Sequence, residues 1–527
     1  MPPIVGAEDA AIGFRYARNL ADGHGFVFNP GGETVEGVTS LLWVFISTAV
    51  YALVGPESLE SVLFVISFLL TAGTLGIVSW LLFECVDGSP ARALATAWLA
   101  AGAGFFFWSG LSLMDVALWA FLLQAYVLTL HLQLEGKSRK PGLLATLVVA
   151  LLLTRPDAML IVPAIAVVGA VVYGASPAWR KATVEIITTH FIALISLTAV
   201  RLWYFGFPLP NTYYSKVPPD IAYRLTQGLT YVGTYFAEHR LALLPFALAV
   251  AWASVSVPMR SRRWPILAGR ADVRLAGFAS GVTIVGFLSI VGVGGDHYQG
   301  HRFLQAYLPM LAITLGVGLH TLLRLCSDRP RLRHAVLAGA GLWALVLIPM
   351  EWRAFSRHGL DHQAFAVGLQ GRAVGRALGE AFEAGSYPEV GLWMAGGAGY
   401  AYPGPVKDLL GLNWIAMGHS AGDRKGVRDH AAFNIDVFWS APPEIMLPEP
   451  EPVVTQTGCT RVILGGALRG LLTTREFEAA YRPVRIRSDD FPPLIAYARA
   501  DWLLNRPASV ERLGWVYCRS LSAPTSR

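Results

Sequence analysis

Residues 7–43 read AEDAAIGFRYARNLADGHGFVFNPGGETVEGVTSLLW and lead directly into an apolar run of membrane-spanning length. The acidic pair Glu8 and Asp9 opens an amphipathic segment in which apolar residues recur at helical spacing from Ile12 to Leu20. Turns rich in glycine and proline separate this segment from the apolar run. A carboxylate pair beside a bilayer is costly to hold there and is a candidate functional site. The alternative is that the two acids only stabilise the positive end of a helix dipole.

The composition predicts a membrane protein that also has a soluble portion. Of the 527 residues, 54% are hydrophobic and 15% are charged, and the mean hydropathy is +0.47, whereas soluble domains carry about 25% charged residues. The net charge of +6 does not indicate nucleic-acid binding, because the basic residues lie in short loops between apolar runs. The sequence contains no nucleic-acid-binding motif, so we expect no nucleic-acid partner.

The apolar pattern predicts a mainly α, polytopic membrane fold of about 10–12 transmembrane helices, each of about 20 residues. Apolar runs lie near residues 38–54, 61–84, 91–108, 112–132, 141–154, 157–175, 183–206, 240–259, 273–293, 303–325 and 333–352. Some of these runs are short or merge with their neighbours.

Basic loops set the expected orientation, because loops rich in Arg and Lys stay on the cytoplasmic side. Such loops contain Lys137/Arg139/Lys140, Arg180/Lys181, Arg260/Arg262/Arg263/Arg270/Arg274 and Arg324/Arg329/Arg331/Arg333. Their parity places the loops at 154–157, 207–239 and 294–302, and everything after residue 353, on the outer side of the cytoplasmic (inner) membrane.

The first two apolar runs leave one question of topology open. An outer first loop needs an odd number of crossings before the Ser89–Arg92 loop, if that loop is cytoplasmic. Residues 38–84, however, look like two helices. Either one of these helices does not span the membrane, or the Ser89–Arg92 loop is not cytoplasmic.

The sequence divides into three expected domains. Residues 1–37 form the first extracytoplasmic loop with the candidate catalytic acids, and residues 38–352 form the multi-pass transmembrane domain. Residues 353–527 have short apolar runs such as Val453–Val454, many prolines and glycines, and no spanning segment. This tail is expected to be a soluble extracytoplasmic domain of the α/β or α+β class.

The four cysteines do not have the spacing of metal ligands. Cys459 and Cys518 both lie in the expected outer domain, where an oxidising compartment permits a disulfide bond between them. Cys85 and Cys326 lie near the membrane or on its inner side.

A second outer stretch, residues 207–216, reads FPLPNTYYSK. Its prolines stiffen the entry, and Asn211, Tyr213 and Lys216 follow at a membrane boundary. These side chains could form a wall for a sugar or a phosphate. The alternative is an interfacial aromatic belt with a lysine that reaches toward the lipid headgroups.

A third outer stretch, residues 294–303, reads GGDHYQGHRF between two apolar helices. Asp296, His297, His301 and Arg302 lie in this glycine-rich turn at an expected helix N-terminus. Such an end favours phosphate, and Arg302 adds a bidentate donor for it. The alternative is a loop with one helix-capping charge. The spacing fits no standard metal site, so no metal is predicted.

These three stretches together suggest one chemistry. A lipid-phosphate sugar donor would be held by Arg302 and its neighbours, while a carboxylate of the first loop deprotonates the acceptor hydroxyl, a general-base role typically worth about 10²–10⁴-fold in rate. Arg155, which pairs in sequence with Asp157 at a membrane boundary, is a weaker candidate for the donor site. The expected partners are therefore the lipid-linked sugar donor, a glycan acceptor and membrane lipids.

The chain resembles a known superfamily at these stretches and at several others. The matching residues are Glu8-Asp9-Ala10, Arg15 to Leu20, Gly23-His24-Gly25, Val27 to Gly31, Val35 to Ser40, Ser109-Gly110-Leu111, Thr154 to Asp157, Pro208 to Lys216, Gly294-Gly295-Asp296 with Arg302-Phe303, and Asp408 to Leu412. On these residues the chain resembles a multi-pass glycosyltransferase of the GT-C superfamily. Within it, the chain resembles the actinobacterial terminal arabinofuranosyltransferase (AftB-type) family and its bacterial relatives.

The resemblance implies an inverting transfer from a polyprenyl-phosphate sugar, with an acid of the first outer loop as base. That role falls on Asp9 or Glu8, and we favour Asp9 because family members usually have two aspartates here. A histidine near the Gly-Gly-Asp loop is functional in the arabinosyl group, and His301 or His297 matches it. Family members also have a membrane helix before the first loop, so we expect an apolar helix encoded immediately upstream of Met1. The resemblance implies no cofactor other than this donor substrate.

Helical geometry separates the two acids of the first loop. Successive side chains of a helix point about 100° apart, so only one of Glu8 and Asp9 can face the site directly, while the other orients it or caps the helix. We therefore expect Asp9 to face Arg302 across an outer cavity.

Two other classes of function also fit a polytopic chain. A transporter or flippase would be expected to show internal repeats and charges at the membrane midplane, whereas the charges here lie in loops. An oligosaccharide ligase or polymerase that uses a lipid-diphosphate donor is the alternative among enzymes.

Overall fold

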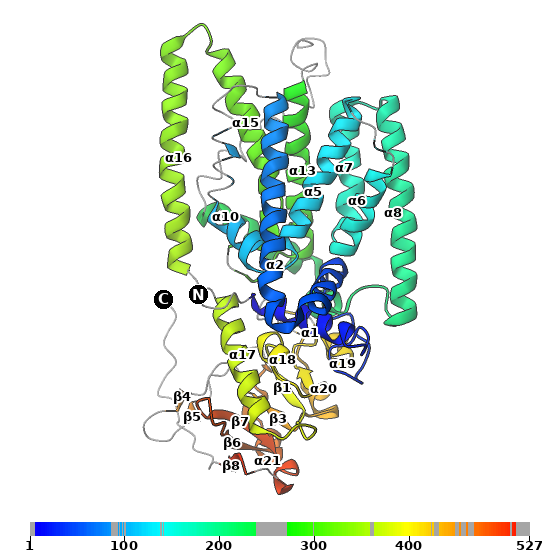
Figure 1. The fold of residues 1–527 in the computed structure, drawn as a ribbon, viewed down its shortest axis with the longest axis vertical. Coiled ribbons are helices and arrows are strands. Elements are labelled where there is room, and N and C mark those ends of the chain that lie inside the picture. Colours follow the sequence, from blue (N-terminus) through cyan, green and yellow to red (C-terminus); the bar gives the residue numbers. More distant parts are fainter. Residues whose placement is uncertain are drawn as a thin grey trace.

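A computed structural model gives the structure of the protein. It describes residues 6–512 except 86–92, 94, 97–98, 100–101, 138–139, 141, 239–270, 299, 359–362, 423, 426–431, 448–452, 455–459, 462–467 and 506–507. A bundle of long helices occupies one end of the molecule, and a small sheet with short helices occupies the other (Figure 1). Helix α1 (Glu8–Ala21) lies where the two parts meet.

The helical bundle is built from residues 41–358. Its elements are α2 (Leu41–Cys85), α4 (Ala103–Phe106), a π-helix (Phe107–Leu111), α5 (Val116–Leu134), α6 (Leu143–Thr154), α7 (Ala158–Tyr173), α8 (Pro177–Tyr204), α9 (Asn211–Lys216), α10 (Ile221–Glu238), α13 (Ala271–Val293), α14 (Arg302–Gln305), α15 (Leu308–Leu325) and α16 (Pro330–His358).

Four of the described helices, α2, α5, α8 and α13, are long and apolar enough to cross a membrane, and α6, α7 and α15 are shorter apolar helices. The prediction of a mainly α, polytopic membrane fold is thereby confirmed. The expected span at 240–259 lies outside the described residues, and the span at 91–108 is only partly described.

Helix α2 is interrupted at Gly55, whose backbone is not helical (φ 74°, ψ 177°), and Pro56 follows it. Residues 41–54 rise only about 21 Å at 1.5 Å per residue, which is less than the roughly 30 Å of a bilayer core. Residues 56–85 rise about 45 Å by the same measure, which is enough to span it. Of the two alternatives left open by the sequence, these lengths favour a first helix that does not span.

The expected outer loop at 207–239 is mostly helical, which corrects its description as a loop. Helix α10 buries Gly228, Tyr231 and Tyr235 on one face and exposes residues such as Leu229 on the other. The apolar residues of α10 are spread along an amphipathic pattern rather than a continuous run, so a search for spanning segments misses this helix.

Residues 363–512, which we call the C-terminal segment, fold around a mixed sheet. Its helices are α17 (Gln363–Ala381), α18 (Gly397–Ala401), α19 (Ile415–Gly418), α20 (Ile435–Ser440) and α21 (Arg475–Ala480), and its strands are β1 (Val390–Leu392), β2 (Val406–Asp408), β3 (Ile445–Met446), β4 (Val453–Val454), β5 (Thr460–Arg461), β6 (Tyr481–Ile486), β7 (Leu494–Arg499) and β8 (Val510–Arg512). The main sheet has the order β2-β1-β3-β7-β6-β8, in which β1 pairs in parallel with β2 and β3 and the other pairs are antiparallel. Strands β4 and β5 form a separate antiparallel pair.

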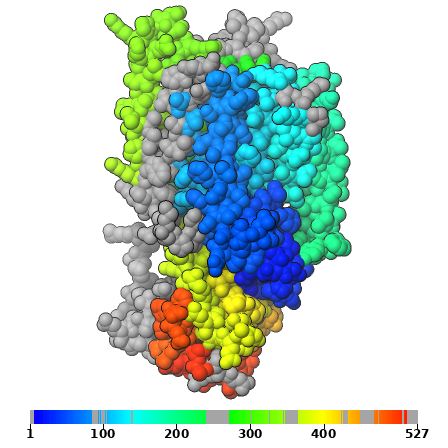
Figure 2. All heavy atoms as spheres, viewed as in Figure 1, coloured from blue at the N-terminus to red at the C-terminus, as the bar shows by residue number. Residues whose placement is uncertain are grey.

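Helix α1 shares a hydrophobic core with the C-terminal segment. Ile12 and Tyr16 of α1 belong to the same cluster of buried side chains as Leu378 of α17, Val390 of β1 and Val406 of β2. Figure 2 shows the dark blue atoms of the N-terminal residues lying between the bundle and the yellow atoms of the C-terminal segment. The first loop is therefore packed against residues that follow it by more than 350 positions.

The predicted Cys459–Cys518 disulfide lies outside the described residues and stays a prediction. Cys326 is a buried free thiol at the end of α15.

Candidate functional site

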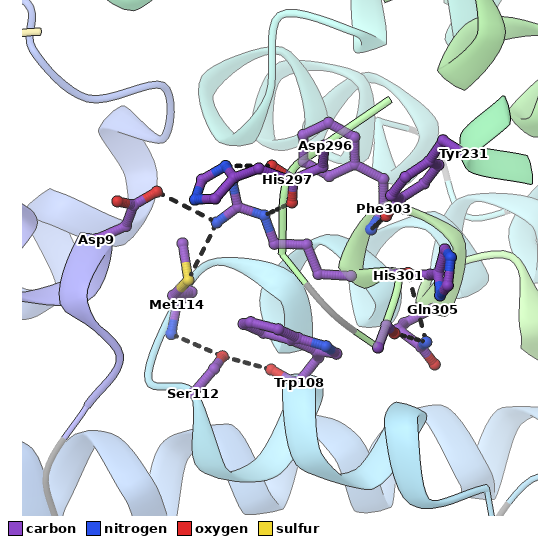
Figure 3. Close-up of polar contacts among 12 residues, drawn as sticks. Asp9, Trp108, Ser112, Met114, Tyr231, Asp296, His297, His301, Phe303 and Gln305 are labelled. Atoms are coloured by element: carbon purple, nitrogen blue, oxygen red, sulfur yellow. Dashed lines mark hydrogen bonds and ion pairs between the residues drawn. The ribbon is translucent and has the colours of Figure 1, made fainter. Parts of the chain in front are cut away.

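Asp9 lies near the start of α1 and points toward two cations from distant parts of the bundle. Its Oδ2 atom is 3.4 Å from Nη1 of Arg302 and 3.7 Å from Nζ of Lys216. Lys216 is the last residue of α9, and Arg302 is the first residue of α14. Figure 3 shows Asp9 reaching from α1 toward the turn that contains Asp296 and His297. The expected separation of Asp9 and Arg302 by a cavity is replaced here by direct contact, because opposite charges attract strongly where little water screens them.

Arg302 is buried and is held on several sides. Its Nη2 atom donates to Oδ1 of Asp296 at 3.1 Å, and its Nε atom contacts Oδ2 of the same carboxylate. The guanidinium also lies 4.4 Å from the ring centroid of Tyr298, and Nη1 is 3.3 Å from the sulfur of Met114. The contacts with Asp296 fix the Nε–Nη2 edge of the guanidinium, and Nη1 is directed at Asp9.

The glycine-rich turn places Asp296 between Arg302 and a histidine. Nδ1 of His297 is 3.4 Å from Oδ1 of Asp296, which is itself buried. These contacts form one charged cluster of five residues, which are Asp9, Lys216, Asp296, His297 and Arg302. Figure 3 labels Asp9, Asp296 and His297.

The two carboxylates of the cluster are held in the ionised state. Burial by itself would raise the pKa of Asp9, but the positive charges of Lys216 and Arg302 outweigh burial and hold the pKa well below its ordinary value. Burial also opposes ionisation of Asp296, yet the Arg302 guanidinium and the neighbouring His297 keep the pKa of that carboxyl far below its usual range. At neutral pH Asp9 therefore carries a charge and can accept a proton.

Glu8 points away from this cluster. Its Oε1 atom accepts a hydrogen bond from the backbone N–H of Gly396 at 2.7 Å, and its Oε2 atom accepts one from Gly397 at 2.8 Å. Burial raises the pKa of Glu8 to about 7, although the two N–H donors favour the charged form. The structure thus directs the two adjacent acids to different partners, in accordance with the 100° step of a helix.

Asn211 and Tyr213, two other residues expected at the donor site, do not contact the charged cluster. The Asn211 amide donates to the backbone carbonyls of Gly411 and Leu412 in the C-terminal segment. The Tyr213 side chain is 43% exposed and packs against the ring of Tyr214. Asn211 has a structural partner, therefore, and Tyr213 lies on the surface.

His301 also turns away from Asp9, and Figure 3 shows the two at opposite sides of the view. Its ring packs on Tyr231 and Tyr235 of α10, with centroid distances of 4.9 and 5.4 Å. Its backbone is left-handed (φ 53°) directly before Arg302, a conformation that non-glycine residues adopt at a cost and that clusters at functional sites. Of the two candidate histidines, His297 is the one in the charged cluster.

Arg155 belongs to a neighbouring group. It pairs with Asp157 at 2.9 Å and with Asp115 at 3.4 Å, and its guanidinium lies 4.6 Å from the ring centroid of Phe303. Phe303 follows Arg302 directly, so Arg155 lies beside the charged cluster without an ion pair to it among the described contacts.

Sequence reasoning missed Met114, Tyr298 and Asp115. Tyr298 stands four residues before Arg302 in the turn already singled out, so the cation–π contact between them could have been sought. Asp115 follows the Ser109-Gly110-Leu111 match by four residues and pairs with Arg155 at 3.4 Å. Met114 has no chemical signal in the sequence. Its loop is joined to the start of α1 by the Ala7 N–H, which donates to the Ser112 carbonyl at 3.0 Å.

Among the described residues, no group of three or more His, Cys, Asp or Glu side chains is arranged to hold a metal ion. The cluster instead combines two carboxylates with a lysine, an arginine and a histidine. Such a set can bind an anionic group, most favourably a phosphate, beside a base that accepts a proton.

Comparison with known proteins finds relatives that are named as sugar transferases. No protein-family model matches the chain. A protein of Corynebacterium glutamicum named terminal β-(1→2)-arabinofuranosyltransferase is 28% identical over 399 residues, which cover 69% of this chain and 56% of that protein. A protein of Mycobacterium tuberculosis with the same name is 28% identical over 387 residues, which cover 66% and 58%. The chain thus spans less than two thirds of the length of these curated relatives.

Solved structures of two transferases share the fold. ArnT from Cupriavidus metallidurans, bound to undecaprenyl phosphate, superposes with a TM-score of 0.52 at 13% identity and covers 95% of both chains. The archaeal oligosaccharyltransferase AglB from Archaeoglobus fulgidus, in complex with an inhibitory peptide and a dolichol-phosphate, superposes with a TM-score of 0.50 at 14% identity and covers 97% of this chain and 72% of its own. The chain therefore has the GT-C type of membrane fold, which confirms that prediction, and its resemblance to the terminal arabinofuranosyltransferases is also confirmed.

Proposed function

We propose that this protein is a membrane glycosyltransferase that transfers a sugar from a polyprenyl-phosphate donor to a glycan of the cell envelope. The single observation that supports this most is the convergence of Asp9, Lys216 and Arg302, which come from three distant elements. The names of the two relatives favour arabinofuranose as the sugar, and we propose an arabinan as the acceptor.

The donor phosphate would bind to Arg302 and Lys216. Both cations reach Asp9 Oδ2 within 4 Å, so an anion placed between them competes with Asp9 for the same N–H groups. A guanidinium held by Asp296 on one side offers its remaining edge to phosphate oxygens without further ordering. The ArnT structure contains undecaprenyl phosphate in the same fold, which is consistent with a lipid-phosphate ligand.

Asp9 would act as the general base. The acceptor hydroxyl gives its proton to the Asp9 carboxylate while its oxygen forms a bond to the anomeric carbon of the sugar. The bond between that carbon and the phosphate oxygen breaks at the same time, and its electron pair leaves with the polyprenyl phosphate. One displacement from the face opposite the leaving group inverts the configuration at the anomeric carbon.

Donor binding would also make Asp9 a stronger base. The pKa of Asp9 is depressed because Lys216 and Arg302 neutralise it. When the donor phosphate shares these two cations, less positive charge acts on the carboxylate and its pKa rises toward the value of a useful base. Lys216 and Arg302 would thus both bind the donor phosphate and set the basicity of Asp9.

The site would face the outer side of the cytoplasmic membrane. The turns between α7 and α8 and between α15 and α16 lie at the end of the bundle opposite the C-terminal segment (Figure 1). Basic residues lie at or directly after these turns, namely Arg180/Lys181 at the start of α8 and Arg329/Arg331/Arg333 at the start of α16. Basic loops stay in the cytoplasm, so the charged cluster and the C-terminal segment would be extracytoplasmic. In this proposal residues 1–37 supply the base, residues 38–352 span the membrane, and residues 353–527 form the outer domain.

A transfer assay tests the proposal. The purified full chain in lipid nanodiscs is incubated with radiolabelled polyprenyl-phosphate arabinofuranose and a synthetic arabinan acceptor. We expect label in the acceptor and release of polyprenyl phosphate. Transfer only from a polyprenyl-diphosphate donor would favour an oligosaccharide ligase or polymerase, and movement of the lipid across the bilayer without transfer would favour a flippase.

A further inference from the structure

The helices that carry the candidate base and one of its two cations, α1 and α9, are both attached by hydrogen bonds to the C-terminal segment. We propose that Glu8 and Asn211 are positioning residues, through which this segment sets the separation of Asp9 and Lys216. The inference rests on the proposed function, in which Asp9 is the base and Lys216 binds the donor phosphate.

Glu8 forms the first attachment. Both of its carboxylate oxygens accept backbone N–H groups, from Gly396 at 2.7 Å and from Gly397 at 2.8 Å. The contact leaves no room for a side chain at Gly396, because a Cβ atom added there would lie 2.0 Å from the Glu8 carbonyl oxygen. Because Asp9 follows Glu8 directly in α1, any movement of Glu8 changes where the Asp9 carboxylate points.

Arg15 attaches α1 to the C-terminal segment at a further point along the helix. It lies seven residues, or about two helical turns, after Glu8 on the same side of α1. Its buried guanidinium donates to the carbonyls of Gly399, Tyr402 and Gly404. Glu8 therefore holds the N-terminal end of α18 while Arg15 holds its C-terminal end. Two attachments along one face prevent α1 from rotating about its axis.

Asn211 forms the second attachment, at the start of α9. Its side-chain amide donates to the carbonyls of Gly411 at 2.7 Å and Leu412 at 2.9 Å. Its backbone N–H donates to the Glu36 carbonyl at 3.0 Å. Helix α9 is short and ends at Lys216, so the position of its first residue fixes where the lysine ammonium can reach.

The two attachments meet at the 3.7 Å contact between Asp9 and Lys216. They should have different kinetic signatures, because Glu8 acts through the base and Asn211 acts through a donor ligand. Loss of the Glu8 attachment should lower kcat with little change in the donor KM. Loss of the Asn211 attachment should raise the donor KM more than it lowers kcat.

The test uses the full chain and the transfer assay with radiolabelled polyprenyl-phosphate arabinofuranose. Glu8→Gln keeps the size of the side chain but presents an amide N–H₂ to one of the two backbone donors. We expect about a 10–100-fold loss of kcat and a donor KM within about threefold of wild type, in keeping with a displaced rather than missing group. Asn211→Ala is expected to raise the donor KM about tenfold, the loss of roughly one charge-assisted contact by Lys216. Glu383→Gln, the same substitution at an exposed glutamate just after α17, is the matched control and should change neither parameter.

Coupling to Asp9 separates positioning from a merely structural role. If Glu8 acts through Asp9, Glu8→Gln should cause no further loss in an Asp9→Asn background. Wild-type kcat per folded molecule in Glu8→Gln, or equal and additive losses in both backgrounds, would overturn the inference. A Glu8→Gln variant as inactive as Asp9→Asn, together with an active Asp9→Asn, would make Glu8 the base and also overturn it. If Asp9→Asn and Glu8→Gln both retain wild-type kcat, the proposed function itself fails.

Discussion

Asp9 and Arg302 are 293 residues apart in the sequence, yet Oδ2 of Asp9 lies 3.4 Å from Nη1 of Arg302. The contact joins the first helix of the chain to the turn before α14. It places a carboxylate that is ionised at neutral pH beside a guanidinium whose other edge is held by Asp296. The proposed chemistry depends on this relationship, and the predictions below test its parts.

Arg302 is expected to bind the donor phosphate. Arg302→Ala should raise the donor KM roughly 10–100-fold, because a charge-assisted hydrogen bond worth about 1.5–3 kcal/mol is lost. The readout is the donor KM in the transfer assay, supported by binding of undecaprenyl phosphate to the purified protein.

The single substitution also leaves the buried Asp296 carboxylate without its main counter-charge, which would destabilise the fold by about 3–5 kcal/mol. The double variant Arg302→Ala/Asp296→Asn removes this penalty and should recover the melting temperature but not the donor KM. Recovery of both would show that Arg302 acts on the fold and not on the donor. Arg487→Ala, on an exposed arginine of the C-terminal segment, should change neither.

The pH profile of kcat/KM, which reports the pKa values of the free enzyme, should reflect Glu8 rather than Asp9. The pKa of Asp9 is held so low that it stays ionised throughout the working range, whereas burial raises the pKa of Glu8 to about 7. A protonated Glu8 is a weaker acceptor for the Gly396 and Gly397 N–H groups. The charges that face Glu8 are Asp9 on its own helix, which raises its pKa, and Arg372 of α17, which lowers it. We expect kcat/KM to fall as the pH drops through about 7 in the wild type, and Glu8→Gln to lack this limb; an identical limb in both proteins would contradict the assignment.

Ionisation of Glu8 should favour turnover but lower the stability of the fold. The pKa of Glu8 is higher in the folded protein, about 7, than its ordinary value of 4.5. The folded state therefore binds more protons between these values, and the free energy of unfolding should decrease as the pH rises from 4.5 to 7. The melting temperatures of wild type and Glu8→Gln should be similar at low pH. As the pH rises toward 7, the melting temperature of the wild type should fall relative to that of the variant. A wild-type melt that gains relative stability across this window would be the contrary result.

A buried ion pair fixes the end of the first loop. Arg201 of α8 donates to both carboxylate oxygens of Glu36 at 2.7 and 2.8 Å, and both side chains are almost fully buried. Glu36→Gln leaves the guanidinium without a counter-charge and should lower the free energy of unfolding by about 3–5 kcal/mol. The double variant Glu36→Gln/Arg201→Met should be closer to wild type than the single one. Equal stability of Glu36→Gln and wild type would show that the pair does not hold the loop.

The sequence alone was sufficient for several parts of this arrangement. Long apolar runs predicted the membrane helices because hydrocarbon burial requires them. The acidic pair and the turn at 294–303 singled out Asp9 and Arg302, because charged groups beside a bilayer are costly to hold there, and the structure brings these two residues into contact. The step of 100° per residue predicted that Glu8 and Asp9 would point to different partners.

Other parts could not be read from the sequence. The partners of Glu8 are backbone N–H groups of two glycines about 390 positions away, and a backbone donor has no residue-specific signal. Asn211 and His301 resemble ligands by residue type, but the Asn211 amide donates to the C-terminal segment and the His301 ring packs against α10. Helix α10 itself was missed because its apolar residues follow an amphipathic pattern.

The most direct test of the central claim is single-turnover transfer by Asp9→Asn, measured with saturating radiolabelled polyprenyl-phosphate arabinofuranose and an arabinan acceptor. Asparagine keeps the shape of the side chain and removes the base, so the rate of transfer should fall by at least about 10²-fold. Binding of undecaprenyl phosphate should be retained or strengthened, because the carboxylate no longer competes for Lys216 and Arg302. Transfer at the wild-type rate by Asp9→Asn would contradict the assignment of Asp9 as the general base.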